Sequence, residues 1–359
     1  MRTCVLDESL DRPGFRHAAA SIGERVGAER LGAAVYEAQA GHPIWPYHYH
    51  HAVEEWMYVI SGRPVLRDAG GERALAGGDL ACFPPGHSGV HTVRGPGRFL
   101  ILSTDAPGPY IAVYPDSDKV AVAVDESSVL VLPRGASVDY WHGEGAGSPA
   151  DSVEVPREQS APSRPVVNAL TATLATRSSG AALGATLGAR RLEATVLELD
   201  PGEAAGDYSY AYGREEWVLV LAGAPTLRHP GGEDSLEVSD LVCFPEGPSG
   251  AHRLANRGDN VVRLLVFSTT GFPVNVAYPD SGSWEMQNGP GVNEVVAPTG
   301  DRAARALRTS PVPGTVSSSL SLAGEQREDG LVDSAAFGLR QRANDALACE
   351  PRPLENSLR

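Results

Sequence analysis

The stretch that decides the fold runs Tyr47-His48-Tyr49-His50-His51-Ala52-Val53-Glu54-Glu55-Trp56. His48 and His50 are two residues apart, and because side chains alternate faces along a β-strand, both imidazoles point the same way. A carboxylate follows at Glu54 or Glu55. The run 56–60 is apolar, aromatic and β-branched, which predicts a second strand directly after these residues.

A further histidine lies downstream of this stretch. The segment Gly78-Asp79-Leu80-Ala81-Cys82-Phe83-Pro84-Pro85-Gly86 leads to His91. Three neutral imidazoles and one carboxylate suit a divalent first-row metal and leave room for water or substrate. A single histidine in a strand is ordinarily a hydrogen-bonded structural residue, but the whole constellation indicates a metal site.

The spacing of these residues resembles the two sequence motifs of the cupin superfamily. The first motif is matched by Gly41, His48, His50, Glu55 and Gly62, with one residue more than the pattern between Gly41 and His48. The second is matched by Gly78, Pro84, Gly86 and His91, although His91 comes two residues late and Gly95 replaces the usual Asn.

The resemblance implies that His48, His50, Glu55 and His91 bind one metal inside a small β-barrel. Glu55 is preferred as the ligand because it has the motif's spacing to the following glycine, and Glu54 remains the alternative. Glu54 is also a candidate catalytic proton carrier. His87, which follows Gly86 in a turn near the pocket mouth, is a second candidate general acid or base, with a solvated turn residue as the alternative.

Composition limits the fold and the partners. A chain of 359 residues predicts two domains, and its 40 Gly and 28 Pro predict many turns between short strands, as in an all-β protein. A net charge of −15 argues against nucleic acid and anionic membranes as partners. The first residues lack a signal-peptide pattern, and no stretch has the length of a membrane span, so we expect a cytoplasmic protein. The four cysteines form no CxxC pair, and in the cytoplasm we expect them to be free thiols.

An internal repeat covers most of the chain. A shift of 161 residues aligns 27–91 with 188–252 without a gap, and roughly half of the paired positions are identical. Tyr114-Pro115-Asp116-Ser117 then recurs as Tyr278-Pro279-Asp280-Ser281. The repeat predicts two copies of one β domain: two tandem cupin-type jelly-roll barrels, or a bicupin.

The two copies differ at the expected ligands. Ser209 and Ala211 replace the two strand histidines, while Glu216 and His252 remain. Two leftover ligands make a poor site for a first-row metal, so we expect the second barrel to be metal-free. The alternative is a pocket lined partly by Ser209, Glu216 and His252 that binds an organic ligand.

The repeat also sets the expected domain boundaries. We predict an N-terminal barrel over 1–142, a Gly-, Ser- and Pro-rich linker over 143–165, a C-terminal barrel over 166–300 and a polar tail over 301–359. The tail could include a helix near 335–346 and could dock on a second subunit, which leaves a homodimer as an open expectation.

The retained aromatic residues predict how the barrels pack. Tyr47 and Tyr49 recur as Tyr208 and Tyr210 although the ligands between them do not. We therefore expect the barrels to pack through the sheet faces that carry these tyrosines, with the second barrel as a scaffold. The ion pair expected for Arg67, which recurs in the second copy, is structural.

The resemblance implies the chemistry. Cupins with this ligand set include dioxygenases, isomerases and decarboxylases, and no GxGxxG or P-loop indicates a nucleotide cofactor. We predict a metal-dependent enzyme acting on a small oxygenated organic molecule, first of all an iron-dependent oxygenase. The alternatives are a metal-dependent isomerase, cyclase or decarboxylase, and a non-catalytic ligand-binding or sensing bicupin. We expect one divalent metal per chain, with iron first and Mn, Ni, Co or Zn as alternatives.

Overall fold

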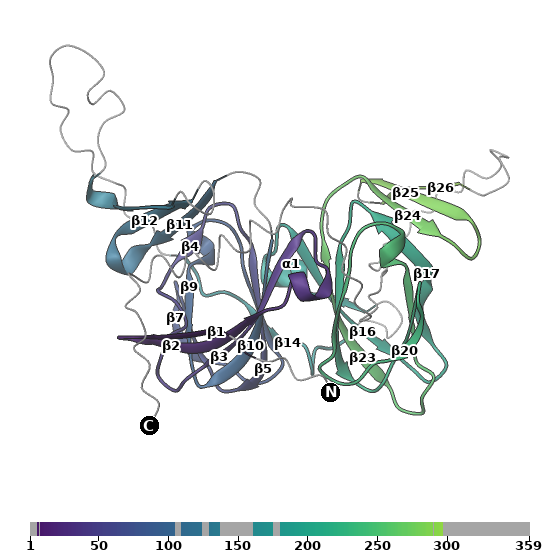
Figure 1. Cartoon of the computed structure of the whole chain (residues 1–359), viewed down its shortest axis with the longest axis horizontal. Coiled ribbons are helices and arrows are strands. Elements are labelled where there is room, and N and C mark those ends of the chain that lie inside the picture. Colours follow the sequence, from purple (N-terminus) through teal and green to yellow (C-terminus); the bar gives the residue numbers. More distant parts are fainter. Residues whose placement is uncertain are drawn as a thin grey trace, which may run out of the picture.

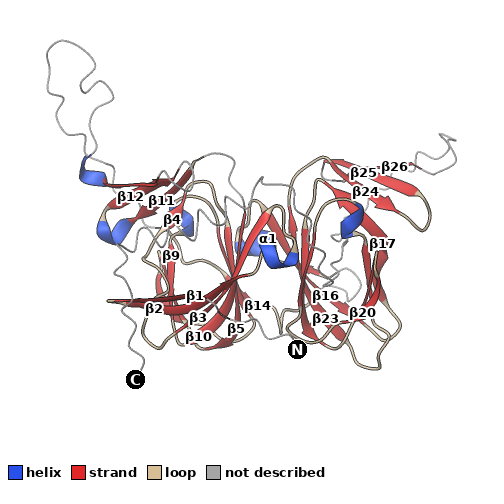
Figure 2. Ribbon diagram, viewed as in Figure 1, coloured by secondary structure: helices blue, strands red, loops and turns tan. Residues whose placement is uncertain are grey.

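The computed structural model describes residues 6, 8–104, 109–123, 129–136, 161–174, 180–289 and 291–296. Within them nearly all regular structure is β, and α1 (Gly184–Leu187) is a single helical turn (Figure 2). The tail over 301–359, its expected helix and most of the expected linker lie outside the described residues. No helix in the described part of the chain is long and apolar enough to cross a membrane.

The first barrel contains two facing layers of antiparallel strands. One layer has the order β1-β2-β3-β10-β5-β8-β14, and the other consists of β7-β6-β9 and β13-β12-β11-β4. Its strands are β1 (Glu8–Arg12), β2 (Phe15–Ser21), β3 (Leu31–Ala38), β4 (Tyr49–His50), β5 (Glu55–Gly62), β6 (Val65–Asp68), β7 (Gly71–Ala74), β8 (Asp79–Phe83), β9 (His91–Arg94), β10 (Gly97–Thr104), β11 (Tyr110–Tyr114), β12 (Lys119–Ala123), β13 (Val129–Pro133) and β14 (Val166–Asn168).

The second barrel repeats these layers as β15-β16-β23-β18-β21 and β20-β19-β22-β17-β24-β25-β26. Its strands are β15 (Ala181–Ala182), β16 (Leu192–Leu199), β17 (Ala204–Tyr212), β18 (Glu216–Ala222), β19 (Thr226–His229), β20 (Gly232–Ser235), β21 (Leu241–Phe244), β22 (His252–Ala255), β23 (Val262–Thr269), β24 (Val274–Tyr278), β25 (Ser283–Gly289) and β26 (Val292–Val296). Figure 1 shows the two barrels side by side with α1 between them. The expected all-β fold of two tandem jelly-roll barrels is confirmed.

Alternation along β5 assigns its residues to two different cores. Met57 and Val59 belong to the core inside the first barrel, whereas Trp56 and Tyr58 belong to a core shared with the second barrel. We call this shared cluster the interbarrel core. It also contains Trp217 and Phe267 of the second barrel, and the rings of Trp56 and Phe267 meet edge to face at 5.9 Å between centroids.

A pair of buried glutamates joins the barrels across this core. Glu54 is fully buried, and its carboxylate accepts hydrogen bonds from the backbone N–H groups of residues 190–192 at 2.6 to 3.2 Å. Its counterpart Glu215 accepts in the same way from the N–H groups of residues 29–31. Each carboxylate also accepts from an indole N–H, that of Trp56 or Trp217. Each barrel therefore holds the other by the same reciprocal contact.

The end of the expected linker and the strand that follows it also connect the two barrels. β14, which the sequence boundaries place in the second domain, pairs with β8 of the first barrel. Arg164 donates from its backbone N–H to Asp68 and from its guanidinium to the carbonyls of Cys82 and Leu187. Cys82 and Cys243 are buried free thiols in the interbarrel core, as expected for these two cysteines.

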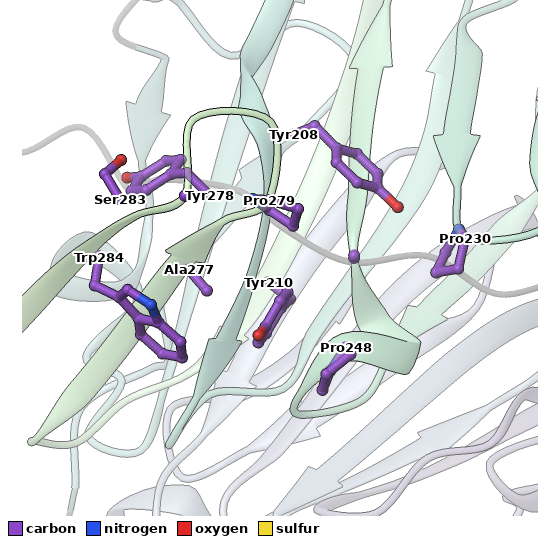
Figure 3. A pocket seen from close by; sticks show the side chains of 11 residues that line it. Tyr208, Tyr210, Pro230, Pro248, Ala277, Tyr278, Pro279, Ser283 and Trp284 are labelled. Carbon is purple, nitrogen blue, oxygen red and sulfur yellow. The ribbon is translucent and has the colours of Figure 1, made fainter. Parts of the chain in front are cut away.

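The prediction that the conserved tyrosines form the interface was wrong. Tyr49 lies with His51 on the outer surface of the sheet that contains β4 and β11, where both line a surface pocket. Figure 3 shows the counterparts Tyr208 and Tyr210 with Trp284 around a corresponding surface pocket of about 330 Å³. The interface is formed instead by the outer face of the layer that contains β5. Its large apolar side chains bury more apolar surface against the second barrel than single tyrosines would.

The tyrosines that the repeat retains have a structural role on this outer surface. The guanidinium of Arg67 lies 3.9 Å above the ring of Tyr47 and pairs with Asp116. Arg228 does the same with Tyr208 and Asp280. The expected structural ion pair of Arg67 is therefore present in both copies.

The reciprocal carboxylates generate the first prediction. Glu54→Gln and Glu215→Gln keep the side-chain shape but replace a carboxylate oxygen by an amide NH₂ that faces backbone donors. We expect each to lower the free energy of unfolding by about 2 kcal/mol, because a buried backbone N–H then loses its acceptor. Urea denaturation measures the change. Glu37→Gln is the matched control, since its side chain is 56% exposed and should change stability little. Equal stability of all three variants would contradict the role of the two carboxylates.

Candidate metal centre

Two strands that pair edge to edge place the three histidines. His48 precedes β4 and forms an isolated antiparallel bridge with His91, the first residue of β9. The two backbones exchange hydrogen bonds of 3.0 and 2.8 Å. This bridge closes the layer between β9 and β4, so that the side chains of His48, His50 and His91 all lie on the inner face of the barrel, where each is less than 5% exposed.

Glu55 completes the cluster from the opposite layer. The Nε2 atoms of His48 and His50 are 2.9 Å apart, and the Oε2 atom of Glu55 lies 3.0 Å from Nε2 of His50. The same oxygen is 3.6 Å from Nε2 of His91 and 4.0 Å from Nε2 of His48. His48, His50 and Glu55 form the tightest group, with ligand atoms within 4.8 Å of one another, and His91 lies at its edge.

Contacts with backbone carbonyls fix which ring nitrogen of His48 and of His91 faces the cluster. The Nδ1 atom of His48 lies 2.9 Å from the carbonyl oxygen of Pro46, and Nδ1 of His91 lies 2.9 Å from that of Gly89. A carbonyl only accepts, so both Nδ1 atoms carry the proton and both Nε2 atoms present a lone pair. This is the tautomer that a metal ligand needs, and the backbone sets it before any ion binds.

The same surroundings fix the charges. Burial, followed by the neighbouring His50 and His91, holds the pKa of His48 well below its usual range. Burial also lowers the pKa of His91 to about 4. Burial by itself raises the pKa of Glu55, but the three imidazoles, His50 first, outweigh it and hold that pKa well below its ordinary value. Near neutral pH His48 and His91 are therefore neutral and Glu55 is ionised.

These four residues fit a divalent cation. Ligand atoms about 2.1 Å from an ion, at angles between octahedral and tetrahedral, lie about 3.0 to 3.4 Å from one another. The shorter separations within the cluster fall near this range. In addition, Nε2 of His91 is a buried acceptor without a hydrogen-bond partner among the described residues, which a metal bond would satisfy.

Aromatic side chains surround the ligands. Phe83 stacks on His91 with 3.6 Å between ring centroids, and Trp45 meets His48 edge to face at 5.8 Å. Tyr110 lies against His50 at 5.1 Å, and Tyr114 stacks on His48 at 5.8 Å. Burial and the charge of Glu55 raise the pKa of Tyr114, so its hydroxyl stays protonated near neutral pH.

The sequence did not single out Tyr110 and Tyr114, because Tyr114 opens a Tyr-Pro-Asp-Ser motif that is typical of a turn. The register shows their true position. Ala112 pairs with His50, and Tyr110 and Tyr114 lie two residues to either side of Ala112, so all three share the inner face with the ligand. Alternation along this strand was the only available signal, and it required knowing which strand pairs with the ligand strand.

Comparison with known proteins agrees with this architecture. Residues 34–104, which contain all four ligands, match the family model described as the cupin domain. The chain therefore has a bicupin fold, with the cupin-domain match in its first barrel and a repeat of the same layers in its second. A search of curated proteins finds no match.

Solved structures similar to this bicupin include proteins of two kinds. One is a sugar phosphate isomerase of the cupin superfamily from Silicibacter pomeroyi, 25% identical, with a TM-score of 0.32, covering 34% of this chain and 76% of its own. Another is a mutant of oxalate decarboxylase from Bacillus subtilis, 15% identical, with a TM-score of 0.44, covering 74% of this chain and 76% of its own.

The two residues proposed from sequence as proton carriers lie away from the cluster in this bicupin. Glu54 points out of the first barrel into the interbarrel core, where its carboxylate is occupied by backbone N–H groups. His87 begins the 3₁₀ turn His87–Gly89. Its ring packs edge to face on Tyr49, on the outer face of β4, with 5.5 Å between ring centroids. The role of both residues as proton carriers stays a prediction, and their contacts here are with the second barrel and with Tyr49.

The second barrel of the bicupin has kept half of the ligand set. His252 stacks on Phe244 at 4.4 Å and pairs through its backbone with Ser209, as His91 does with His48. Ser209 donates to the carbonyl of Asp207, and Ala211 packs against Val274 and Val276. Small side chains thus occupy the positions of two imidazoles, which favours a metal-free second barrel.

The two adjacent glutamates generate a prediction about metal content. Glu55→Gln removes the one carboxylate that faces the imidazoles in the described part of the chain, so we expect metal per chain to fall well below that of the unsubstituted protein. Glu54→Gln is the matched control, because Glu54 faces the other barrel, and it should keep its metal. Elemental analysis of protein purified without chelators measures both. Loss of metal only in Glu54→Gln would reverse the assignment.

The degenerate second barrel generates another. Ser209→His combined with Ala211→His would restore the ligand set next to Glu216 and His252. Val274, a smaller side chain, stands where the first barrel has Tyr110 beside its ligand. We expect the metal content to rise from about one to about two per chain. An unchanged content in a folded double variant, or two metals in the unsubstituted chain, would contradict the account of how the second site was lost.

Proposed function

We propose that the protein is a divalent-metal-dependent enzyme that acts on a small oxygenated organic molecule through proton transfer, as in an isomerisation or decarboxylation. The observation that carries the proposal is the buried cluster of His48, His50, Glu55 and His91. In it the Nε2 atoms of His48 and His91 are set as acceptors, and Glu55 is ionised, before a cation binds. A divalent ion bound there would polarise a carbonyl or carboxylate oxygen of the substrate.

The residues of the chain would supply the rest of the chemistry. The rings of Tyr110, Tyr114 and Phe83 exclude water from one side of the ligands and strengthen electrostatic interactions there. Tyr110 and Tyr114 both bring a phenolic hydroxyl to this wall, and each ring lies against a ligand ring. Because proton transfer needs such a group and oxygenation does not, the site favours the first class of reaction.

An iron-dependent oxygenase is the second candidate, since three imidazoles and one carboxylate leave coordination positions open for dioxygen and substrate together. The same donor set accepts Fe, Mn, Ni, Co or Zn, so the identity of the metal follows from the reaction and not from the ligands. A non-catalytic binding protein would use the same cluster to anchor a ligand without turnover. These three outcomes differ in their need for dioxygen and in product formation.

Turnover with and without dioxygen distinguishes them. Protein loaded in turn with Mn²⁺, Fe²⁺, Co²⁺ or Ni²⁺ is given β-keto acids, α-hydroxy ketones, enediols and catechols, and products are followed by NMR beside an oxygen electrode. We expect product under anaerobic conditions and a rate at least about 1000-fold lower in His50→Ala, since metal polarisation contributes several kcal/mol.

His51→Ala is the matched control, because His51 is adjacent but exposed on the outer face, and it should keep the full rate. Consumption of dioxygen that requires Fe²⁺ would establish the oxygenase instead. Saturable binding with no product in either atmosphere would establish the binding protein.

A further inference from the structure

The hydroxyl of Tyr114 lies inside the first barrel, on the same face as the metal-ligand residues. Tyr114 is 1% exposed, shares the inner face with the ligands and stacks on His48 with an angle of 20° between the rings. Its hydroxyl has no hydrogen-bond partner among the residues that the structure describes. Most buried polar groups in proteins are hydrogen-bonded, because an unpaired one destabilises the fold. An unpaired hydroxyl beside the cluster of metal-ligating residues indicates that a bound molecule supplies its hydrogen-bond partner.

The repeat provides an internal comparison. Tyr278 is the counterpart of Tyr114, and its hydroxyl donates a 2.9 Å hydrogen bond to Glu285. Glu285 pairs with Val276 in β24, and the matching position beside Ala112 in the first barrel is Ala121. The barrel that has lost its metal ligands thus satisfies this tyrosine internally. The barrel that has kept them replaces the carboxylate partner by a methyl group.

A positive charge accompanies the unpaired hydroxyl. Lys119 is the only lysine of the chain and pairs directly with Tyr114 across β11 and β12, so both side chains stand on the same face. Its ammonium lies 5.2 Å from the centroid of the Tyr114 ring. The second barrel has Ser283 at this position, paired with Tyr278. A hydroxyl donor and an ammonium therefore occur together only in the barrel with the metal ligands.

We propose that Tyr114 and Lys119 together bind a carboxylate group of the substrate, so that the substrate is a small oxygenated organic acid. The Tyr114 hydroxyl donates to a carboxylate oxygen and the Lys119 ammonium supplies the opposite charge, while another substrate oxygen reaches the metal ligands. This assignment of substrate class rests on the proposed function. It replaces Glu285 of the second barrel by a carboxylate that arrives with the ligand.

Two chelating probes test the assignment on Mn²⁺-loaded protein by isothermal titration calorimetry. Malonate carries two carboxylates, and acetohydroxamate chelates a metal through its hydroxamate oxygens and has no carboxylate. We expect Tyr114→Phe and Lys119→Met each to weaken malonate binding by tenfold or more, because each removes an interaction with a charged group. Lys119→Met should leave acetohydroxamate binding unchanged, and neither variant should lose metal by elemental analysis.

Two further variants separate ligand binding from folding. Tyr114→Phe should not lower the melting temperature of the ligand-free protein, whereas Tyr278→Phe should lower it because Glu285 loses its donor. Ala121→Glu should pair with Tyr114 as Glu285 pairs with Tyr278, and so weaken malonate binding with all four metal ligands intact. Unchanged malonate affinity in Tyr114→Phe or Lys119→Met would overturn the assignment of a carboxylate. Failure of both probes to bind the unsubstituted metal-loaded protein would instead overturn the proposed function.

Discussion

Two adjacent carboxylates on opposite faces of one strand determine much of this structure. Burying an ionised carboxylate costs several kcal/mol unless hydrogen bonds or opposite charges surround it. Glu54 meets this requirement through backbone N–H groups of the other barrel, and Glu55 meets it through three imidazoles of its own barrel. A shift of this strand by one residue would place each carboxylate in the wrong surroundings. The interface and the metal centre therefore depend on the same register.

This shared register explains why the second barrel persists although two of its four ligand positions have changed. Glu215 and Trp217 repeat the interface contacts of Glu54 and Trp56, and the two interface glutamates hold the barrels together from both sides. Selection on this contact requires the glutamate and the tryptophan in both copies. It requires nothing of the inner face beyond packing, so the positions of Ser209 and Ala211 were free to change.

The inner faces of the two barrels have diverged in opposite directions. At the end of the first barrel near the ligands, Val53, Ala121 and Ala123 form an apolar cluster with the two tyrosines of β11. At the same place in the second barrel stand Arg214, Glu285 and Gln287. Arg214 donates to Gln287, and Gln287 donates to Glu285. The first barrel has imidazoles at its ligand positions and apolar side chains at this end. The second barrel has small side chains at the two changed ligand positions and polar side chains at this end.

The sequence could predict the fold and the cluster because both follow from short-range patterns. The repeat, the alternation of His48 with His50, and the spacing from Glu55 to a glycine each act within one or two strands. The interface could not be read in this way. Tyr47 and Trp56 both recur in the second copy, and only the pairing of distant strands shows that the tryptophan faces the other barrel. The same limit hid Tyr114, whose inner position follows from pairing across more than sixty residues with the ligand strand.

The unpaired hydroxyl of Tyr114 also follows from this divergence. In the second barrel a carboxylate on β25 satisfies the tyrosine, and that barrel then gains stability from a hydrogen bond that needs no ligand. In the first barrel the same tyrosine contributes nothing comparable among the described residues, although replacing it by phenylalanine would remove a buried unpaired group. The hydroxyl therefore stabilises neither the barrel nor the metal-ligand residues. Since the Tyr114 ring stacks on His48, the hydroxyl is placed to bind a molecule held beside that residue. The cost of leaving it unpaired is therefore the strongest physical argument that the first barrel is built to receive a polar ligand.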